Sequence, residues 1–398
     1  MKNIVKKVVV STIILSAGIT ILFYTGDKLS VSADKIKEYN SHNHYMEQPP
    51  TNWGAYKEKV KVKGIFLTGN SFGYTKRYKN LLKLSQESEI NSMVIDIKDD
   101  NGVLTYNSNV PMAIEIGANG VVKISNKELF KDRMKEIISN NVYPIARIVT
   151  FKDRVAGFNR PDLAIKDKNG DVWKDNKGNA WLNPYNKESW EYPLKLAEEA
   201  VSMGFKEIQF DYVRFPTDGN RSNIDYGEIA KSKTKAEAIS GFLKYAREKL
   251  NNKGVYVSAD VFGDIINVKG DSTIGQHLET LGESVDVLSP MVYPSHYALG
   301  SYGVDYPDSN PYIIINNSMN DAIKRLSSIP EEKRAIIRPW LQDFSAPWLK
   351  RDYGKNYISY GKEEVRAQIK ATYDAGLEEW ILWNAGNKYT EEALKKEE

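Results

Sequence analysis

The chain has 398 residues, of which 41% are hydrophobic and 11% aromatic, so it can bury a large core and still present aromatic rings on a binding surface. Its net charge is only +3 and its basic residues are spread along the whole chain, so the sequence does not indicate a nucleic-acid-binding surface. A weak association with an anionic cell wall is compatible with this charge. Cysteine is absent and histidine occurs four times, which excludes a cysteine nucleophile or ligand and argues against a metal site built from several histidines.

Residues 1–33 have the basic, apolar, polar order of an export signal. Lys2, Lys6 and Lys7 precede an uncharged run from Val8 to Tyr24, and the small residues at 31–33 resemble a signal-peptidase site. We predict an exported protein whose residues 1–33 are either cleaved after Ala33 or retained as a membrane anchor through residues 8–24. The remaining chain would then be extracellular or attached to the outer face of the cytoplasmic membrane.

Residues 34–60 are polar and contain the Pro49-Pro50 pair, which indicates a linker. His42 and His44 invite a metal interpretation, but no further ligand is near in sequence, so a solvated linker is preferred.

From residue 61 to 398 short apolar runs alternate with longer amphipathic stretches, a pattern typical of βα units and a parallel sheet. Together with helices predicted at Lys187–Met203, Thr234–Asn251 and Lys362–Ala375, eight strands favour a closed (β/α)8 barrel, an α/β fold, over an open sheet. The longer interruptions at 99–124, 151–186 and 293–317 follow strands and should build the active-site face. The predicted strands are Gly64–Leu67, Ser92–Ile97, Val142–Thr150, Glu207–Phe215, Gly254–Val261, Val285–Val292, Ala335–Trp340 and Glu379–Trp383.

Charged residues at the carboxyl ends of these apolar strands are the candidates for chemistry, because a buried strand has little structural use for them. In the fourth strand, alternation places Gln209, Asp211 and Val213 on one side and Phe210, Tyr212 and Arg214 on the other, so Asp211 faces the barrel axis if Gln209 does.

Asp260, at the equivalent height on the fifth strand, would form a carboxylate pair with Asp211. Cleavage of a glycosidic bond needs such a pair, one acid to protonate the leaving oxygen and one carboxylate to attack carbon or to activate water. Asp96, Asp99 and Asp343 are rival members of the pair.

Structural roles compete with these catalytic ones. Asp211 could form a buried ion pair with Arg147 or Arg338, and Asp96 and Lys98, predicted on the same side of their strand, could pair with their neighbours. A Ca²⁺ or Mg²⁺ ion at Asp96, Asp99 and Asp100 is a weaker alternative, and no metal or other cofactor is assigned. 

Aromatic residues at the strand ends could either stack on sugar rings or belong to the core; these are Trp340, Trp383, Tyr293 and, in a loop, Trp348. His296 could bond a sugar hydroxyl or donate a proton, or have no such role. The chain has no phosphate-binding loop and no H-E-x-x-H motif.

Several segments resemble a bacterial family that is assigned to the glycoside hydrolases chiefly by the analogy of its barrel. The likeness covers about residues 60–395. The segments that carry it are Val94–Gly102, Tyr143–Val149, Trp181–Pro184, Ile208–Pro216, Ser258–Gly263 and Ser289–Tyr297.

This resemblance implies a TIM barrel related to the α-amylase and family-A glycosidase barrels, often found in exported or surface proteins. In α-amylase-type barrels the fourth strand supplies an Asp nucleophile, the fifth a Glu acid and the seventh a second Asp. Asp211 matches the nucleophile of the fourth strand, and Asp343 matches the Asp of the seventh strand if the strand alignment holds. On the fifth strand, however, Asp260 stands where a Glu is expected. Its shorter side chain leaves open an inverting mechanism or a role without hydrolysis.

We therefore carry two hypotheses. The first is an extracellular glycoside hydrolase that cleaves a polysaccharide, with Asp211 as nucleophile or base, Asp260 as general acid, and a surrounding set of substrate-binding residues. The second is a barrel that binds wall or exopolysaccharide without turnover and serves envelope or surface organisation. The substrate-binding set is Asp96, Lys98, Asp99, Arg147, Arg214, Tyr293, His296, Trp340, Asp343 and Trp383.

Overall fold

The computed structural model describes residues 11–15, 18–22, 60–120, 122–124, 126–394 and 396. The chain divides into two compact units, residues 1–48 and 49–398. In the first unit the described backbone forms two antiparallel strands, β1 (Ser11–Leu15) and β2 (Gly18–Leu22). The remainder of the predicted signal, with Ala33, and almost all of the predicted linker lie outside the described residues. None of the helices in the described part of the chain has the length and apolar character of a membrane span.

In the second unit eight parallel strand segments close into a barrel, because β3 pairs with both β4 and β15. This confirms the predicted (β/α)8 barrel. The seventh segment is divided in two by Arg338 and Pro339, and proline has no N–H to give to a strand ladder. The barrel strands are β3 (Lys63–Leu67), β4 (Ser92–Lys98), β7 (Tyr143–Val149), β9 (Glu207–Asp211), β11 (Tyr256–Phe262), β12 (Val287–Met291), β13 (Ile336–Ile337) with β14 (Trp340–Gln342), and β15 (Trp380–Trp383).

The predicted strands coincide with these within a few residues, except the fourth. Strand β9 ends at Asp211, four residues before the predicted end, because Tyr212 has φ of 50° and turns the backbone out of the strand conformation. Side chains after Asp211 therefore no longer follow the alternation of the strand.

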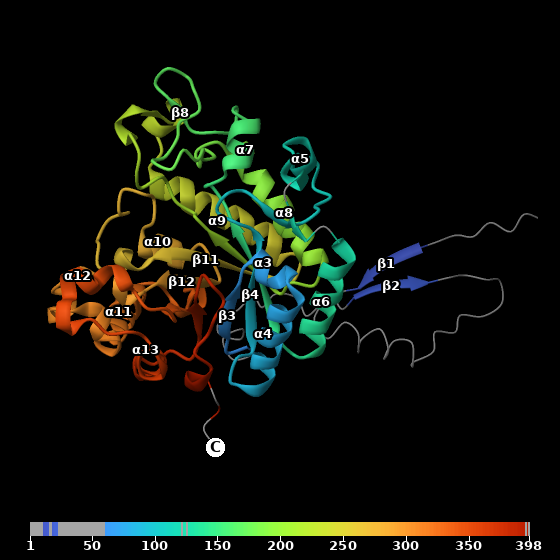
Figure 1. Ribbon diagram of the computed structural model, residues 1–398. Helices are drawn as coiled ribbons and strands as arrows, with labels where there is room; N and C mark the ends of the chain where they lie inside the picture. Colours follow the sequence, from blue (N-terminus) through green and yellow to red (C-terminus); the bar gives the residue numbers. More distant parts are fainter. Residues whose placement is uncertain are drawn as a thin grey trace, which may run out of the picture. The chain divides into compact units, whose positions relative to one another are not determined.

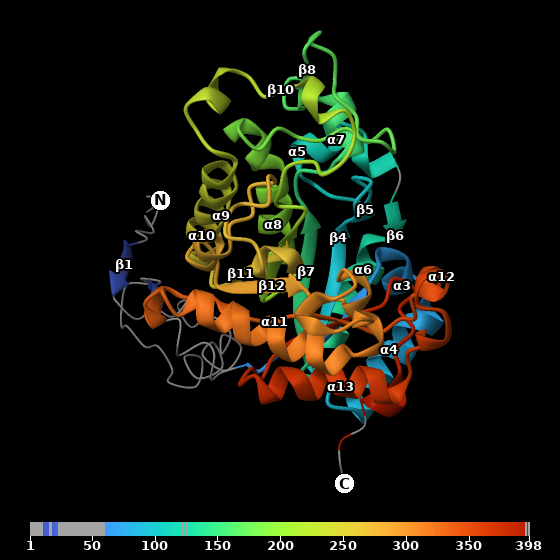
Figure 2. The same ribbon diagram turned by 90° about the vertical axis from the view of Figure 1, so that its left-hand side faces the viewer.

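Helices cover the outside of the barrel, as Figures 1 and 2 show. The three predicted helices are α8, which follows a 3-10 turn at Lys187–Trp190, α9 and α13. In α9 a capping box joins Thr234 and Glu237, which satisfies N–H groups that the first turn leaves free. The helices are α3 (Gly69–Gly73), α4 (Thr75–Glu87), α5 (Pro111–Glu115), α6 (Lys127–Ser139), α7 (Arg154–Asn159), α8 (Glu191–Ser202), α9 (Lys235–Asn251), α10 (Leu278–Gly282), α11 (Pro311–Leu326), α12 (Lys350–Tyr353) and α13 (Lys362–Asp374).

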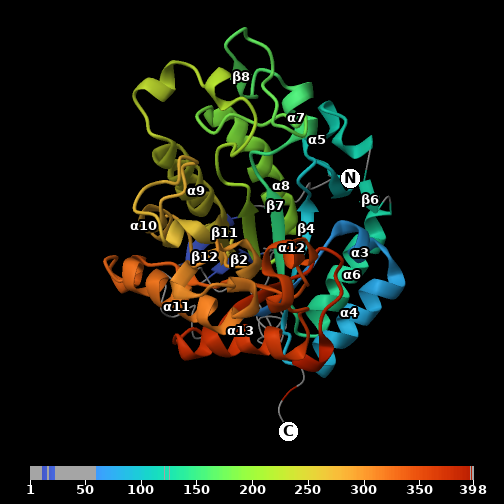
Figure 3. The same cartoon turned by 60° about the vertical axis from the view of Figure 1, so that its left-hand side comes forward.

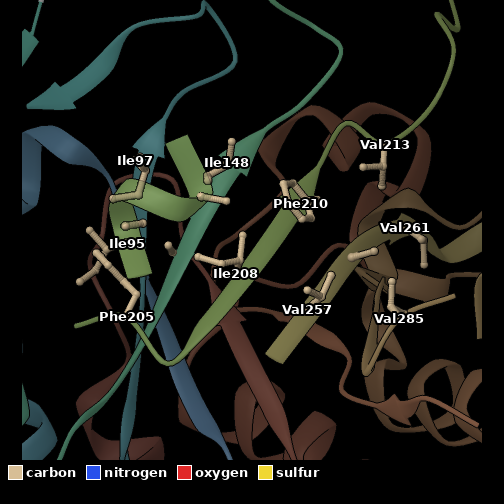
Figure 4. Packing of buried hydrophobic residues seen from close by; sticks show 14 of the residues in the cluster. Ile95, Ile97, Ile148, Phe205, Ile208, Phe210, Val213, Val257, Val261 and Val285 are labelled. Atoms are coloured by element: carbon tan, nitrogen blue, oxygen red, sulfur yellow. The ribbon is translucent and has the colours of Figure 1, made fainter. Parts of the chain in front are cut away.

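The apolar core has two layers on either side of the strands. The outer layer packs strand residues such as Ile95, Ile208, Phe210 and Val257 against the helices (Figure 4). A smaller inner layer fills the barrel and includes Phe66 and Trp340 from strands on either side of β15. The apolar residues of β9 thus face outward and leave its polar residues for the interior.

Long loops extend beyond the carboxyl ends of the strands. After β4 the chain adds β5 (Leu104–Tyr106), antiparallel to β4, and β6 (Val122–Ile124). The loops after β7 and β9 meet through the short pair β8 (Lys166–Asp167) and β10 (Ile224–Asp225), which Figures 2 and 3 place beyond α7. These loops surround the end of the barrel where the charged strand ends lie.

Candidate active site

Three adjoining cavities lie at the carboxyl ends of the strands. The central cavity, about 160 Å³, is lined by Arg147, Asp211, Asp260, Trp340 and other strand-end residues. A first-loop cavity of about 250 Å³ shares Arg147, Tyr212 and Trp383 with it, and an aromatic cavity of about 850 Å³ shares Tyr212, Arg214, Phe262, Met291 and Tyr293. A larger cavity of about 950 Å³ lies at the other end of β3, by Lys61 and Lys63, and includes no predicted site residue.

Arg147 on β7 binds two carboxylates from the neighbouring strands. Its Nη1 donates to Asp96 Oδ1 at 2.5 Å, while Nε and Nη2 donate to Asp211 Oδ2 at 3.0 and 2.5 Å. All three side chains are less than 10% exposed. The predicted ion pair between Asp211 and Arg147 is therefore present, and Arg338, the other predicted partner, lies elsewhere with Glu207 and Glu379.

Asp260 on β11 stands beside Asp211 without an arginine partner. The register that pairs Ala259 with Phe210 brings the next two residues, Asp260 and Asp211, to the same level on adjacent strands, about 5 Å apart at Cα. The Trp340 indole N–H donates to Asp260 Oδ1 at 2.6 Å. Burial, together with the charge of Asp211, raises the pKa of Asp260 well above its ordinary value, against the opposing effects of Arg147 and Trp340. Asp260 is thus a buried carboxyl group whose environment favours the protonated form, beside an ion-paired carboxylate.

Asp96 occupies the far side of the same arginine and lines the first-loop cavity with Asp99. Burial raises the pKa of Asp96 to about 7, with Arg147 opposing the shift. Asp99 lies at the cavity edge, where its Oδ1 accepts the backbone N–H groups of Asn101 and Val103 and so shapes the turn after β4.

Aromatic rings form the walls around the carboxylates. Trp383 stacks on Phe66 with ring centroids 4.2 Å apart, and both rings face the guanidinium of Arg147 at about 5.5 Å. Tyr293 is buried between the central and aromatic cavities, and its pKa is raised by burial and by Asp260 and Asp211. Trp340 is fully buried, so its role is to hold Asp260 rather than to offer a free face to a sugar.

The position of Arg214 differs from the prediction. Alternation placed it opposite Asp211, but the left-handed turn at Tyr212 reverses the order: Val213 joins the outer core, whereas Tyr212 and Arg214 line the central cavity with Asp211. The Arg214 guanidinium lies 4.7–5.0 Å from the rings of Trp181, Tyr212 and Phe262.

Two predicted residues lie apart from the site. A β-bulge between Asp96 and Lys98 turns the two side chains to different sides, so the prediction that they share one side was wrong. Lys98 is fully buried, pairs with Asp153 at 2.5 Å and faces the Tyr192 ring of α8. Asp343 accepts both the N–H and the hydroxyl of Thr390, at 2.9 and 2.6 Å, and borders none of the three cavities.

His296 borders the aromatic cavity, 5.4 Å from the Tyr293 ring and 6.5 Å from the Trp348 ring. Burial lowers its pKa, so the imidazole is neutral at pH 7. A neutral ring at this edge can exchange hydrogen bonds with a ligand, but it does not line the central cavity that contains Asp260.

Several site residues were missed by sequence reasoning. Phe66 and Phe262 lie at or near the ends of apolar strands and carried no polar signal, and Tyr212 was assigned to the side of β9 opposite Asp211. Trp181 lies in the loop 151–186, which was predicted to build the active-site face, and this was its only signal in the sequence. Its contact with Arg214 joins two different loops and therefore could not be predicted from residue spacing. Within the described ranges no group of three or more His, Asp or Glu side chains is arranged to hold a metal ion, including Asp96, Asp99 and Asp100.

Residues 64–389 match the protein family described as "Putative glycosyl hydrolase domain". The chain belongs to this family. The resemblance seen in the sequence is therefore confirmed, and the glycosyl hydrolase family assignment agrees with a barrel whose carboxylates gather at the carboxyl ends of its strands.

Solved structures similar to this family member include glycoside hydrolase barrels. The glycoside hydrolase domain of PgaB (BpsB) from Bordetella bronchiseptica is 11% identical with a TM-score of 0.58, over 85% of this chain and 100% of that one. An inactive variant of the family-20 exo-β-N-acetylglucosaminidase from Vibrio harveyi is 13% identical with a TM-score of 0.51, over 82% and 50%. At these identities the likeness shows the fold alone.

A hypothetical protein from Ruminiclostridium thermocellum is 43% identical over 50% of this chain and 97% of that one, with a TM-score of 0.45. Among curated proteins, none matches the chain.

Proposed function

We propose that this chain is an extracellular glycoside hydrolase that cleaves a polysaccharide with Asp260 as general acid and Asp211 as the second carboxylate. The observation that carries the proposal is the unequal pair in the central cavity. One aspartate is paired with Arg147, whereas the other has no ion pair among the described residues, accepts a hydrogen bond from the Trp340 indole and has a pKa raised by burial. Two carboxyl groups whose environments divide acid from base are what glycosidic cleavage requires.

In the proposed reaction Asp260 gives its proton to the glycosidic oxygen as the bond from that oxygen to the anomeric carbon breaks. Asp211 either attacks the anomeric carbon, which forms a glycosyl ester that water then cleaves while Asp260 takes up a proton from that water, or it takes a proton from a water that attacks the carbon directly. A separation of about 5–5.5 Å between the two carboxyl groups would favour direct attack, and one of about 6.5–9.5 Å would favour activation of a water. The anomer of the first product, followed by NMR, distinguishes the two routes.

Arg147 has a positioning role in this mechanism. Its Nε and Nη2 hold one oxygen of Asp211, and the Tyr212 N–H donates to the other at 2.5 Å, so the carboxylate is fixed on both sides. The Trp340 indole fixes Asp260 in the same way. Trp383, only partly buried at the mouth of the central cavity, can stack on a sugar ring.

The decisive experiment measures release of reducing ends from bacterial exopolysaccharides, peptidoglycan and α- and β-glucans by the full chain in mild detergent. Asp211→Asn and Asp260→Asn should each abolish turnover while the thermal unfolding midpoint stays near that of wild type. Asp286→Asn is the matched control, because Asp286 is also a fully buried aspartate with a raised pKa, about 8, but lines none of the three cavities. Loss of turnover in the control as well would remove the case for a specific pair.

A barrel that binds polysaccharide without turnover is the second candidate. Two observations favour it: Arg147 already neutralises Asp211, and the fifth strand offers Asp260 in place of the longer Glu. It predicts that wild type and both aspartate variants retain polysaccharide equally and release no reducing ends from any polymer of the panel.

The proposed extracellular location rests on the basic, apolar, polar order of residues 1–33. Cell fractionation and mass determination of the mature N-terminus test it. A mature chain beginning at Asp34 indicates secretion, an intact chain in the membrane fraction indicates an anchor, and an intact chain in the cytoplasm contradicts export.

A further inference from the structure

Arg214 differs from the other buried arginine of the site in having no carboxylate partner. It is 7% exposed, yet no Asp or Glu oxygen of the described residues lies within 4.0 Å of its guanidinium. Its one hydrogen bond is from Nη1 to the backbone oxygen of Phe215, at 3.0 Å. Arg147, by contrast, has an oxygen of Asp96 and an oxygen of Asp211.

The free edge of this guanidinium meets the cavities. Nε and Nη2, the two nitrogens that offer parallel N–H groups, have no hydrogen-bond partner among the described residues, and neither is sealed from solvent. Arg214 lines both the central and the aromatic cavity. Parallel N–H groups of this kind match the two oxygens of a carboxylate.

Three rings fix the guanidinium in place. Trp181, Tyr212 and Phe262 surround it at 4.7–5.0 Å, and Trp181 is itself held by a hydrogen bond from its indole to Asp175. Cation–π contacts offset part of the cost of removing the charge from water, but they give it no counter-ion and satisfy none of its N–H groups. A preorganised cation of this kind binds an anion with little further ordering.

The charges nearby leave room for an anion. Of the charged side chains that line the central cavity, Arg147 is paired with Asp211, Arg214 has no ion pair among the described residues, and burial raises the pKa of Asp260. Asp218 and Asp175 also act on the charge of Arg214, but neither forms an ion pair with it. The aromatic cavity adds one carboxylate, Asp264, which forms no ion pair with Arg214. Arg214 would thus attract an anionic sugar that binds beside Asp211 and Asp260.

We propose that Arg214 is a specificity-determining residue that binds a carboxylate on the sugar next to the cleaved bond, so that the substrate is an acidic polysaccharide. This inference rests on the proposed function for the location of the cleaved bond. The carboxylate could belong to a uronic acid or to a lactyl ether on an amino sugar, which have the same planar group.

The test compares polymers that differ only in this charge. Hyaluronan and peptidoglycan glycan strands freed of peptide are each assayed before and after chemical reduction of their carboxylates to alcohols. We expect kcat/KM of wild type to be about 10- to 100-fold higher on at least one acidic form than on its reduced form, as befits a charge-assisted hydrogen-bonded pair. The polymer that shows the preference identifies the source of the carboxylate.

Variants at Arg214 show whether this residue causes the preference for the acidic polymer. Arg214→Gln should lose this preference, so that its kcat/KM is the same on the acidic and on the reduced polymer. Arg214→Lys, which keeps the charge and the ring contacts of the stem, should keep part of the preference. Arg221→Gln is the matched control, since Arg221 is exposed and lines none of the three cavities. Thermal unfolding of each variant separates a local effect from misfolding, and Arg214→Lys serves alone if Arg214→Gln does not fold.

Each other result counts against the inference. If wild type uses acidic and reduced polymers equally, the inference about Arg214 is overturned and the hydrolase proposal stands. The same holds if Arg214→Gln keeps the preference for the acidic polymer. A preference only for a phosphate-bearing wall polymer would overturn the carboxylate assignment. If no polymer is cleaved, the proposed function fails separately, and retention of the acidic over the reduced polymer by wild type, lost in Arg214→Gln, still decides the inference.

Discussion

The barrel contains two buried arginines that each bind two carboxylates, at opposite ends of its strands. Arg147 joins Asp96 and Asp211 at the carboxyl ends. Arg338 joins Glu207, at the start of β9, and Glu379, just before β15, at 2.7 and 2.8 Å.

The two clusters differ in access and in neighbours. The Arg338 cluster is at most 3% exposed and lines none of the three site cavities, whereas the Arg147 cluster lines two of them and stands beside the protonated Asp260. The same arrangement of one arginine and two carboxylates therefore has two different roles. Where it does not border a cavity it can only join strands, and where it borders one it can hold a carboxylate in position for a ligand.

The largest expected effect is on turnover. Arg147→Met should lower kcat about 10²- to 10³-fold, because Asp211 loses the charge that fixes it beside Asp260. Arg338→Met should leave kcat per folded molecule within about twofold of wild type. Reducing-end release, corrected for the folded fraction by circular dichroism, measures both; equal losses would mean that the two clusters do not divide function from structure.

For stability we expect the larger effect from the Arg338 variant. Arg338→Met should lower the free energy of unfolding by about 3–5 kcal/mol, because two buried glutamates lose the guanidinium that they share. Arg147→Met should cost less, since cavity water can hydrate its aspartates and Asp96, with a pKa of about 7, readily takes up a proton. Urea unfolding measures the difference. Adding Glu207→Gln and Glu379→Gln to Arg338→Met should recover most of the loss; no recovery would show that the arginine acts through packing alone.

Much of this arrangement could be predicted from the sequence. Apolar runs and their spacing are local, so the eight strands and the helices α8, α9 and α13 followed from period. The inward direction of Asp211 followed only on the condition that Gln209 also faces the barrel axis. The pairing of Asp211 with Arg147 was also among the predicted alternatives. These features depend only on alternation within one strand and on the order of neighbouring strands.

The rest depends on backbone irregularities that leave no mark in the pattern. A positive φ is unusual for tyrosine, so nothing in the sequence of β9 indicated that Tyr212 would reverse the alternation and bring Arg214 into the cavity. The bulge that separates Lys98 from Asp96 likewise arises from pairing with β7. Both departures occur where strands end at the site, which is where tertiary contacts outweigh local preference.

The next effect is on the pH dependence of turnover. A raised pKa keeps Asp260 protonated, so the general acid is active at low pH and is lost as pH rises through that pKa, by about tenfold in kcat for each further pH unit. Asp96 also titrates near pH 7 and could produce a similar decline. Asp96→Asn separates them: an unchanged alkaline decline assigns it to Asp260, whereas a decline that disappears would make Asp96 the controlling group.

The smallest expected effect distinguishes Asp343 from the pair. The α-amylase resemblance would make Asp343 a third catalytic aspartate, but its oxygens accept two hydrogen bonds from Thr390 and so attach the C-terminal segment to β14. Asp343→Asn keeps one acceptor, so it should lower the free energy of unfolding by only about 1 kcal/mol and leave kcat and the pH profile unchanged. A hundredfold fall in kcat at constant stability would instead show that Thr390 releases this carboxylate when substrate binds, and that the barrel uses three aspartates where the resting structure brings two together.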